Sequence, residues 1–297
     1  MPDKDLIVIG AGVAGLTASK LAAQQGYSTL NIESFVFGGL VLNINELDGE
    51  PHGSGAEYSS NLLMEISDLG VESINEAVTG LQQNGDAISV TTDQGSHSAR
   101  AVVIASGAHL KKLGVPGEAE FQDRGVAHCA DCDGPMYQGQ TVVVVGGGDS
   151  ALQEALVLAQ FAAEVRLVHR GTTFRAQKHL ADAVAAKDNI KVQWNTVVEK
   201  ISGAEGVQSV QVNSGGQKNE IACSGIFAYV GLKPNSDFTP VGVKREVDGL
   251  IITDDAMQTG MKNVLAIGAV RSGYGGRLTQ AIAEAGTAVA TLKQMLG

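Results

Sequence analysis

The sequence predicts an α/β protein with two doubly wound, Rossmann-like dinucleotide-binding domains of three ββα layers, the second inserted in the first. The main observation is that an apolar strand, a glycine turn, a helix and a second strand follow one another twice along the chain. The other is a helical segment at 279–296, which follows the second unit and has no domain of its own. We expect this segment to pack on the first domain, which makes the second domain an insertion.

The first unit begins almost at the start of the sequence. Residues 6–9 are predicted as an apolar strand, 16–25 as an alanine-rich helix and 28–32 as the next strand. Two further strands, 87–92 and 98–104, are separated by a DQG turn. The breaker segment GVPG at 114–117 then interrupts all periodicity and is a natural hinge.

The second unit repeats this order, with strand 141–145, helix 151–163 and strand 165–168. The elements predicted after it are strands 192–201, 207–212 and 224–230, the breaker segment 232–240, a strand pair at 251–253 and 264–267, and the helix 279–296. The predicted domains are therefore 1–113 with 239–297, and 114–238.

Composition excludes several classes of protein. Glycine accounts for 38 of 297 residues without a three-residue period, so the chain is not collagen-like, and 44% apolar against 18% charged residues excludes disorder. The net charge of −11 argues against nucleic-acid or anionic-membrane partners. No secretory signal or membrane span is visible, so we expect a soluble, cytoplasmic protein.

The first glycine turn, Gly10, Gly12 and Gly15, fits GxGxxG between a strand and a helix. Such a turn lets the backbone approach a pyrophosphate at the helix N-terminus. Glu33 ends the second strand, 18 residues after Gly15, where its carboxylate can accept hydrogen bonds from ribose hydroxyls. The alternative interpretation of Glu33 is a solvated acid at a strand end.

The second turn, Gly146, Gly148 and Ala151, fits GxGxxA, and His169 stands as far from Gly146 as Glu33 does from Gly10. Arg170 and Arg175 follow. Cationic residues in place of the acid favour a 2′-phosphate, hence NADPH over NADH. The two turns thus fit FAD and NADPH, respectively, so 1–113 with 239–297 is predicted to bind FAD and 114–238 to be an NAD(P)H-binding type of domain.

A CxxC pair, Cys129 and Cys132, precedes the second unit, and Asp133 follows it as a candidate acid or base. A CxxC pair can close a disulfide and exchange it with another. The alternatives are two reduced surface thiols or a zinc site, for which no second ligand pair is visible. Cys223 lies in an apolar strand and is predicted to be buried, and His128 is either an orienting group or a surface residue.

The order GxGxxG, CxxCDG, GGGDSA and HRxxxxR resembles the low-molecular-weight thioredoxin reductases, and the resemblance covers the whole chain. It implies that Cys132 faces the flavin, that Cys129 attacks the partner's disulfide and that Asp133 is the acid. It also implies a homodimer whose inserted domain rotates about hinges near 114–117 and 236–240. The FAD contacts predicted from the motifs and the resemblance are Gly10, Gly12, Ala14, Gly15, Glu33, Gly38, Gly39, Ser106, Gly107, Gly268, Ala269, Gln280 and Ala281. The NADPH contacts are Gly146, Gly148, Asp149, Ser150, His169, Arg170 and Arg175. No metal is predicted.

Three departures from the family pattern matter. Gly171 stands where the family has a second arginine, Ala269 where it has an aspartate that holds the flavin ribityl chain, and Leu40 where it has a glutamine. Relatives with eroded nicotinamide sites take electrons from ferredoxin, use a second flavin or act as dithiol oxidases.

Three functions therefore remain open. The leading one is an FAD enzyme that passes electrons from NADPH through the dithiol to thioredoxin or a thioredoxin-like protein. The second keeps the dithiol but uses ferredoxin, a second flavin or oxygen in place of NADPH. The third is a flavin-binding redox sensor without turnover, which the joint presence of both cysteines and Asp133 disfavours.

Overall fold

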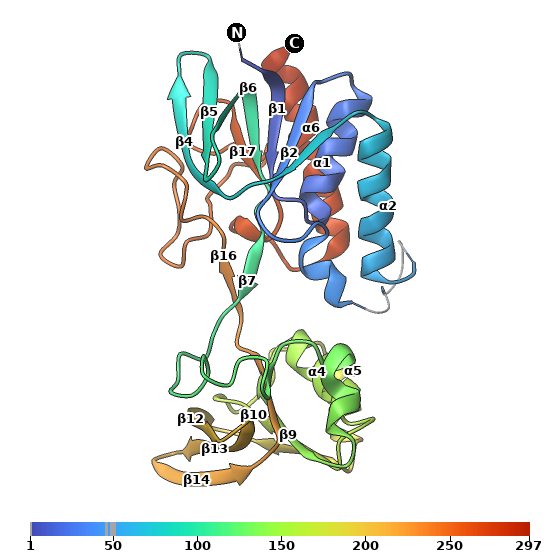
Figure 1. The fold of residues 1–297 in the computed structure, drawn as a ribbon, viewed down its shortest axis with the longest axis vertical. Coiled ribbons are helices and arrows are strands. Elements are labelled where there is room, and N and C mark those ends of the chain that lie inside the picture. The colour runs from blue at the N-terminus through green and yellow to red at the C-terminus, as the bar shows by residue number, and fades with distance from the viewer. Residues whose placement is uncertain (1, 45–46, 48–51) are drawn as a thin grey trace. The chain divides into compact units, whose positions relative to one another are not determined.

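The computed structural model describes residues 2–44, 47 and 52–297, and its chain divides into two units (Figure 1). Unit 1 comprises Met1–His109 and Lys233–Gly297, and unit 2 comprises Leu110–Leu232. The C-terminal helix α6 (Leu278–Leu296) belongs to unit 1, as the sequence predicts. In the described residues, no helix has the length and apolar character needed to cross a membrane.

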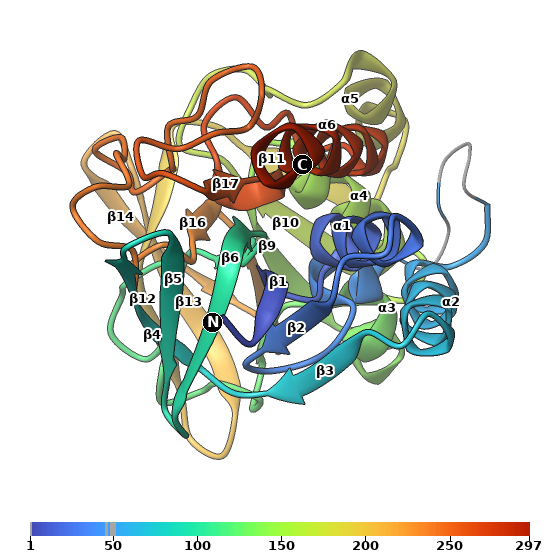
Figure 2. The same cartoon turned by 90° about the horizontal axis from the view of Figure 1, so that it is seen from above.

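Unit 1 is built on a parallel sheet that branches at strand β6 (Ser96–Ile104). The parallel strands are, in spatial order, β3 (Glu72–Asn75), β2 (Thr29–Glu33), β1 (Lys4–Ile9), β6 (Ser96–Ile104) and β17 (Val264–Ala266). The first half of β6 also pairs antiparallel with a hairpin made of β5 (Ala87–Thr92) and β4 (Val78–Asn84). The helices are α1 (Val13–Gln24), α2 (Gly55–Asp68) and α6. In Figures 1 and 2, α1 and α6 lie side by side, away from the hairpin.

The alternation of side chains along β1 explains these layers. Leu6 and Val8 belong to one buried cluster with the alanines of α1 and α6, whereas Ile7 and Ile9 belong to another with the hairpin residues Ile88 and Val90. Successive side chains of a strand point to opposite faces, so one apolar strand supplies both cores. The result is a ββα arrangement of three layers.

Unit 2 repeats this arrangement. Its parallel strands are, in spatial order, β11 (Ile190–Gln193), β10 (Glu164–Val168), β9 (Thr141–Gly146), β15 (Gly225–Tyr229) and β8 (Val126–Ala127). The antiparallel layer contains β12 (Thr196–Gly203), β13 (Val207–Ser214) and β14 (Gln217–Ala222), and the helices are α3 (Ala130–Asp133), α4 (Asp149–Leu158) and α5 (Lys178–Ala185). Val142 and Val144 face the helices, and Val143 and Val145 face the antiparallel layer. The predicted fold class is confirmed in both units.

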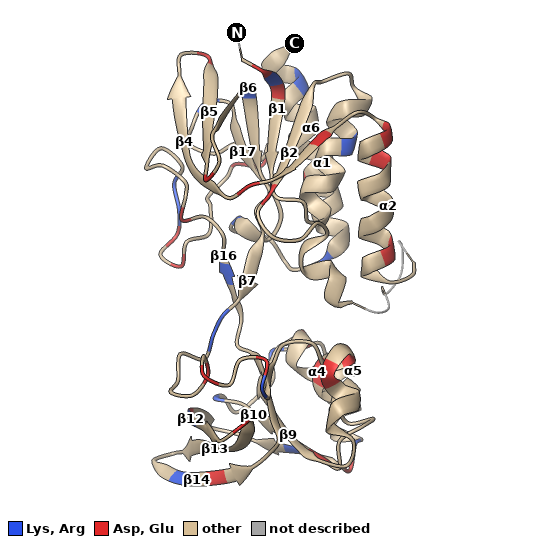
Figure 3. Ribbon diagram, viewed as in Figure 1, with Lys and Arg blue, Asp and Glu red and all other residues tan. Residues whose placement is uncertain are grey.

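Short elements complete the chain. They are the 3-10 helices η1 (Gly39–Asn43), η2 (Gly134–Tyr137) and η3 (Gly268–Val270), and the paired strands β7 (Ala108–Leu110) and β16 (Leu232–Pro234). Lys and Arg residues are interspersed with Asp and Glu residues over both units (Figure 3).

The unit boundaries differ from the predicted ones, because residue 109 ends the first segment where 113 was expected, and residue 232 ends unit 2 where 238 was expected. Glu118 accepts hydrogen bonds from the N–H groups of Leu113 and Gly114, both at 2.7 Å, and so holds the GVPG segment to unit 2. Asn235 instead donates its N–H to the carbonyl of Gly107, at 3.0 Å, inside unit 1. Glycine and proline breakers therefore do not mark the boundaries themselves.

Three predicted elements differ most from the observed ones. The strand predicted at 192–201 is two strands, β11 and β12, because Asn195 takes a left-handed conformation (φ 52°) between them. The helix predicted to reach residue 163 ends at Leu158, and the N–H of Ala163 bonds to the carbonyl of Gln140 instead of continuing the helix. The strand predicted at 251–253 is reduced to isolated bridges at Ile251.

Candidate functional site

The first glycine turn connects β1 to α1. At two of its positions no residue larger than glycine fits. A Cβ at Gly10 (φ 106°) would lie 2.3 Å from the carbonyl oxygen of Ala105, and a Cβ at Gly15 would lie 1.9 Å from that of Gly10. Gly12 differs, because the nearest atom to a Cβ there is 3.9 Å away, on Gly38. Gly10 and Gly15 are therefore required by packing, whereas Gly12 leaves open space beside the helix N-terminus.

The carboxylate of Glu33 is fixed next to this turn. Its Oε2 accepts the N–H of Ala11 at 2.8 Å, and its Oε1 accepts the N–H groups of Ser34 and Phe35 at 2.8 and 3.0 Å. The loop at Gly38 and Gly39 reaches the same place: the N–H of Gly38 donates to the carbonyl of Ala11 at 2.7 Å, and a Cβ on Gly39 would lie 3.2 Å from the Cα of Gly12. The structure thus brings Gly38 and Gly39 into contact with the glycine turn, although they are distant from it in sequence.

Ser106 and Gly107 follow β6 just as Gly10 follows β1, so both segments lie at the carboxyl edge of the parallel sheet. Asn235 fixes them. Its Nδ2 donates to the carbonyl of Ser106 at 2.8 Å, its own carbonyl accepts the Ser106 hydroxyl at 2.6 Å, and its Oδ1 lies 2.6 Å from Nδ1 of His109. Asn235 was not among the predicted site residues, although it lies in the breaker segment that the sequence marks.

The last predicted FAD contacts lie around η3 and the start of α6. Gly268 (φ 71°) leaves only 3.0 Å between its would-be Cβ and the Cβ of Ala14, and its N–H donates to Oε2 of the buried Glu284 at 2.7 Å. Gln280 donates to Oε1 of Glu284 at 2.8 Å, and Ala281 is buried in the core. Ala269 offers no polar side chain here. Glu284, which also pairs with Arg271 at 3.4 Å, was missed because no motif contains it.

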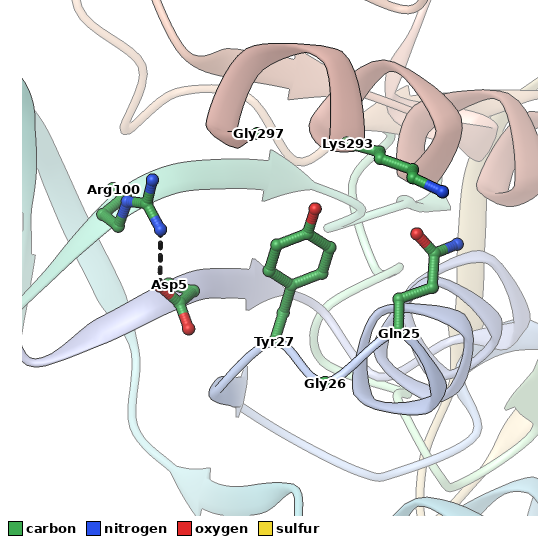
Figure 4. A pocket seen from close by; sticks show the side chains of 7 residues that line it. All are labelled: Asp5, Gln25, Gly26, Tyr27, Arg100, Lys293 and Gly297. Carbon is green, nitrogen blue, oxygen red and sulfur yellow. Dashed lines mark hydrogen bonds and ion pairs between the residues drawn. The ribbon is translucent and has the colours of Figure 1, made fainter.

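These residues fit a dinucleotide at the carboxyl edge of the sheet, because Gly12 and Gly107 leave open space there and Glu33 is held beside the turn. A surface hollow of about 480 Å³ lies elsewhere in unit 1 (Figure 4). This hollow lies at the end of β1 opposite to the glycine turn and contains none of the predicted site residues. The residues that line it are Asp5, Gln25, Gly26, Tyr27, Arg100, Lys293 and Gly297. The candidate dinucleotide site is therefore identified by the end of the sheet at which the parallel strands finish, and not by the size of this hollow.

The second glycine turn has the same division between packed and open glycines. A Cβ on Gly146 would lie 2.5 Å from the carbonyl oxygen of Tyr229, whereas Gly148 has no neighbour within 4 Å. Asp149 begins α4, and its Oδ1 accepts the N–H of Gln177 at 2.7 Å. Ser150, the next residue, is exposed.

The cationic segment after β10 lies against this turn. The N–H of Arg175 donates to the carbonyl of Gly147 at 2.8 Å. His169 is buried: its Nε2 lies 3.0 Å from the carbonyl oxygen of Thr173, and its ring packs with Phe174 and Trp194. Arg170 and Arg175 are exposed, and within the described residues neither guanidinium forms a hydrogen bond or ion pair. Only these two of the three predicted cationic positions present their side chains to solvent.

Cys129 and Cys132 form a disulfide at α3, with their Cα atoms 5.3 Å apart. The N–H of Cys132 donates to Sγ of Cys129 at 3.2 Å, and Cys132 is the more exposed of the two. Burial, and then the charge of Asp123, raise the pKa of Asp133 above its ordinary value, although His128 lowers it. Asp133 therefore retains a proton at higher pH than an ordinary aspartate does.

The third cysteine is chemically separate. Cys223 is buried, and burial raises the pKa of its thiol to about 12. In the part of the chain that the structure describes, no group of three or more His, Cys, Asp or Glu side chains could hold a metal ion.

The sequence and the fold have known relatives. Residues 4–290 match the pyridine nucleotide-disulphide oxidoreductase family. Thioredoxin reductase of Treponema pallidum is 38% identical over 276 residues, which are 91% of this chain and 90% of that protein, and that of Bacillus subtilis is 36% identical over 90% and 86%. A crystal structure of Lactococcus lactis thioredoxin reductase superposes with a TM-score of 0.94 at 35% identity, covering 99% of both chains. The chain therefore belongs to the pyridine nucleotide-disulphide oxidoreductases and, within them, to the low-molecular-weight thioredoxin reductase family.

Proposed function

We propose that this FAD-dependent disulfide oxidoreductase takes two electrons from NADPH and passes them, through Cys129 and Cys132, to the disulfide of thioredoxin or a thioredoxin-like protein. The observation that carries the proposal is the Cys129–Cys132 disulfide, followed directly in sequence by Asp133 with its raised pKa, in a chain of this family. Bound FAD supplies the two-electron exchange between the nicotinamide and this disulfide.

The chain's own residues would perform the thiol chemistry in two steps. The Cys129 thiolate attacks one sulfur of the partner's disulfide, which forms a mixed disulfide and releases one partner thiolate. Cys132 then attacks Sγ of Cys129, so the mixed disulfide breaks, the second partner thiol leaves and the internal disulfide forms again. Asp133 gives a proton to a leaving thiolate. The N–H of Cys132, which already donates to Sγ of Cys129, stabilises negative charge on that sulfur.

The same reasoning assigns the cofactor contacts. Gly12, with its open space, would hold the FAD pyrophosphate at the start of α1, and Glu33 would accept from the ribose. Gly148 would hold the NADPH pyrophosphate, and the free guanidinium groups of Arg170 and Arg175 would hold the 2′-phosphate. The other predicted contacts keep the roles that the family resemblance implies.

One observation favours a second candidate, in which ferredoxin or a second flavin replaces NADPH, or oxygen accepts the electrons. A Cβ at Gly171 would lie 2.9 Å from Nε2 of His169. The arginine that the family has here could not be accommodated unless the buried His169 ring moved. The nicotinamide site of this chain thus has two exposed arginines where the family pattern has three.

Anaerobic reduction of the bound flavin separates these candidates. We expect NADPH to bleach the flavin absorbance within the turnover time, and NADH to do so more slowly. Reduced ferredoxin is tested in parallel as a third electron donor. If only ferredoxin bleaches the flavin, the NADPH-dependent function is refuted and the ferredoxin-dependent one is supported.

The dithiol has its own test. In thioredoxin reduction, Cys129→Ser and Cys132→Ser should each abolish turnover, while Cys223→Ser, the matched control at the buried third cysteine, should retain it. Turnover that survives both active-pair substitutions would refute the role of the pair, and biological activity that survives Cys129→Ser would indicate a redox sensor.

We further propose a homodimer, which sedimentation velocity of the flavin-loaded protein would test. Rotation of the inserted domain and the cytoplasmic location stay predictions from the sequence.

A further inference from the structure

A half-buried carboxylate lies directly behind the dithiol segment. Oε2 of Glu154, on α4, accepts two hydrogen bonds: one from the N–H of Ala130 at 2.7 Å and one from the hydroxyl of Tyr229 at 3.0 Å. Ala130 is fully buried and follows Cys129 directly. Glu154 therefore fixes the peptide group that joins Cys129 to α3.

Tyr229 is in turn fixed by the sheet. It ends β15 in register with Gly146, its side chain is buried, and its carbonyl oxygen lies 2.5 Å from where a Gly146 Cβ would be. Burial and the nearby Glu154 carboxylate raise the pKa of Tyr229, so its hydroxyl keeps its proton and remains a donor. A rigid strand thus holds the carboxylate, and the carboxylate holds the redox segment.

The groups that face this pair are mostly acidic. Asp131, on α3, acts on both Glu154 and Tyr229, and Asp133, also on α3, acts on Tyr229. Asp123 and His128 in turn act on Asp133. Burial raises the pKa of Glu154, the hydrogen bonds from Ala130 and Tyr229 lower it, and Asp131 raises it further. At a pH above this raised pKa, the ionised Glu154 carboxylate places a negative charge against the N–H of Ala130, the residue after Cys129.

We propose that Glu154, held by Tyr229, is a positioning residue for the dithiol: it anchors the peptide after Cys129 and disfavours ionisation of the Cys129 thiol. The inference rests on the proposed function of the Cys129–Cys132 pair. Reduction of the disulfide by two electrons consumes two protons if both sulfurs become thiols and one if Cys129 becomes a thiolate. The Glu154 charge favours the first outcome.

The test measures the Cys129 thiol directly. In the full-length, flavin-loaded Cys132→Ser protein, the alkylation rate of Cys129 by iodoacetamide is followed against pH, and mass spectrometry identifies the modified residue. Cys223 does not interfere, because the pKa of its thiol is raised to about 12. The measurement needs neither NADPH nor thioredoxin, so its failure is distinguishable from failure of the proposed function.

We expect Glu154→Gln, which keeps an oxygen acceptor but removes the charge, to lower the apparent pKa of Cys129 by about one to two units, as for a unit charge roughly 7 Å away at an effective dielectric constant near 20. Glu205→Gln, at an exposed carboxylate in the turn after β12, is the matched control and should leave the profile unchanged. A Glu154→Gln profile equal to that of the control would overturn the proposal.

Tyr229→Phe provides the second variant. Since Tyr229 acts through Glu154, removing its hydroxyl should shift the thiol profile when Glu154 is present and add no shift in the Glu154→Gln background. Equal shifts in both backgrounds would contradict the inference. If Glu154→Gln fails to fold, an unchanged profile in Tyr229→Phe alone would also overturn it.

Discussion

The glycines of the first turn should separate into one that serves ligand binding and one that serves packing. A Cβ at Gly15 would lie 1.9 Å from the carbonyl oxygen of Gly10, so Gly15→Ala must displace α1 from β1. We expect it to destabilise the apoprotein by about 1–3 kcal/mol, the usual range for overpacking. At Gly12, φ is −74° and the nearest atom is 3.9 Å away, so Gly12→Ala should change apoprotein stability by less than about 0.5 kcal/mol.

For FAD binding the order of the two substitutions should be reversed: Gly12→Ala should weaken FAD binding more than Gly15→Ala does. A methyl group at Gly12 fills the space where the backbone would approach the pyrophosphate. Losing one charge-assisted hydrogen bond corresponds to about 1.5–3 kcal/mol, which is roughly a 10- to 150-fold weaker FAD affinity. Gly12→Ala should therefore fold normally and bind FAD poorly.

Urea unfolding of the flavin-free protein and titration with FAD, followed by flavin fluorescence, measure the two effects separately. Gly286→Ala is the control, because Gly286 lies within α6 with no neighbour within 4 Å of a Cβ, and alanine there should stabilise by about 0.5–1 kcal/mol. Unchanged FAD affinity in Gly12→Ala would refute the assignment of the pyrophosphate to this turn. Equal destabilisation by Gly12→Ala and Gly15→Ala would refute the packing argument.

Three further predictions concern the rest of the site. The pKa of Asp133 is raised, and its carboxyl loses its proton as pH rises through that pKa, so the rate of thioredoxin reduction should fall over that pH range. Asp133→Asn should remove this pH dependence and lower the rate about 100-fold or more. A pH profile that is retained in Asp133→Asn would exclude Asp133 as the acid. Ala269→Asp should restore a flavin contact and tighten FAD binding by about 1–3 kcal/mol. Ala204→Asp, at an exposed turn, is the control. An unchanged Kd for FAD in Ala269→Asp would contradict this prediction. Arg170→Ala and Arg175→Ala should each raise the KM for NADPH about tenfold and change the KM for NADH little. Lys200→Ala, at an exposed lysine, is the control and should leave the KM for NADPH unchanged. Equal effects of the arginine substitutions on both nucleotides would exclude recognition of the 2′-phosphate.

Features carried by residues close together in sequence could be predicted without the structure. GxGxxG between a strand and a helix, and CxxC followed by Asp133, are local patterns whose geometry is set by a single turn. The repeated strand, turn and helix order likewise specified two domains of one architecture, since apolar alternation along a strand decides which faces are buried. Where one residue breaks such a pattern, as Asn195 does between β11 and β12, hydropathy alone did not find the break.

Contacts between distant segments were decided only by the tertiary structure. Asn235 holds Ser106 across 129 positions, and Tyr229 reaches Glu154 across 75. No periodicity encodes such pairs, because they depend on which strands become neighbours in a sheet. The same is true of His169, which its spacing placed as the counterpart of Glu33 but whose ring packs with Phe174 and Trp194. The sequence by itself determined the chemistry that the chain carries, in its glycine turns and its dithiol. Tertiary packing determined the raised pKa of Asp133 and the hydrogen bonds that hold the site residues in place, since burial and long-range hydrogen bonds exist only in the folded chain.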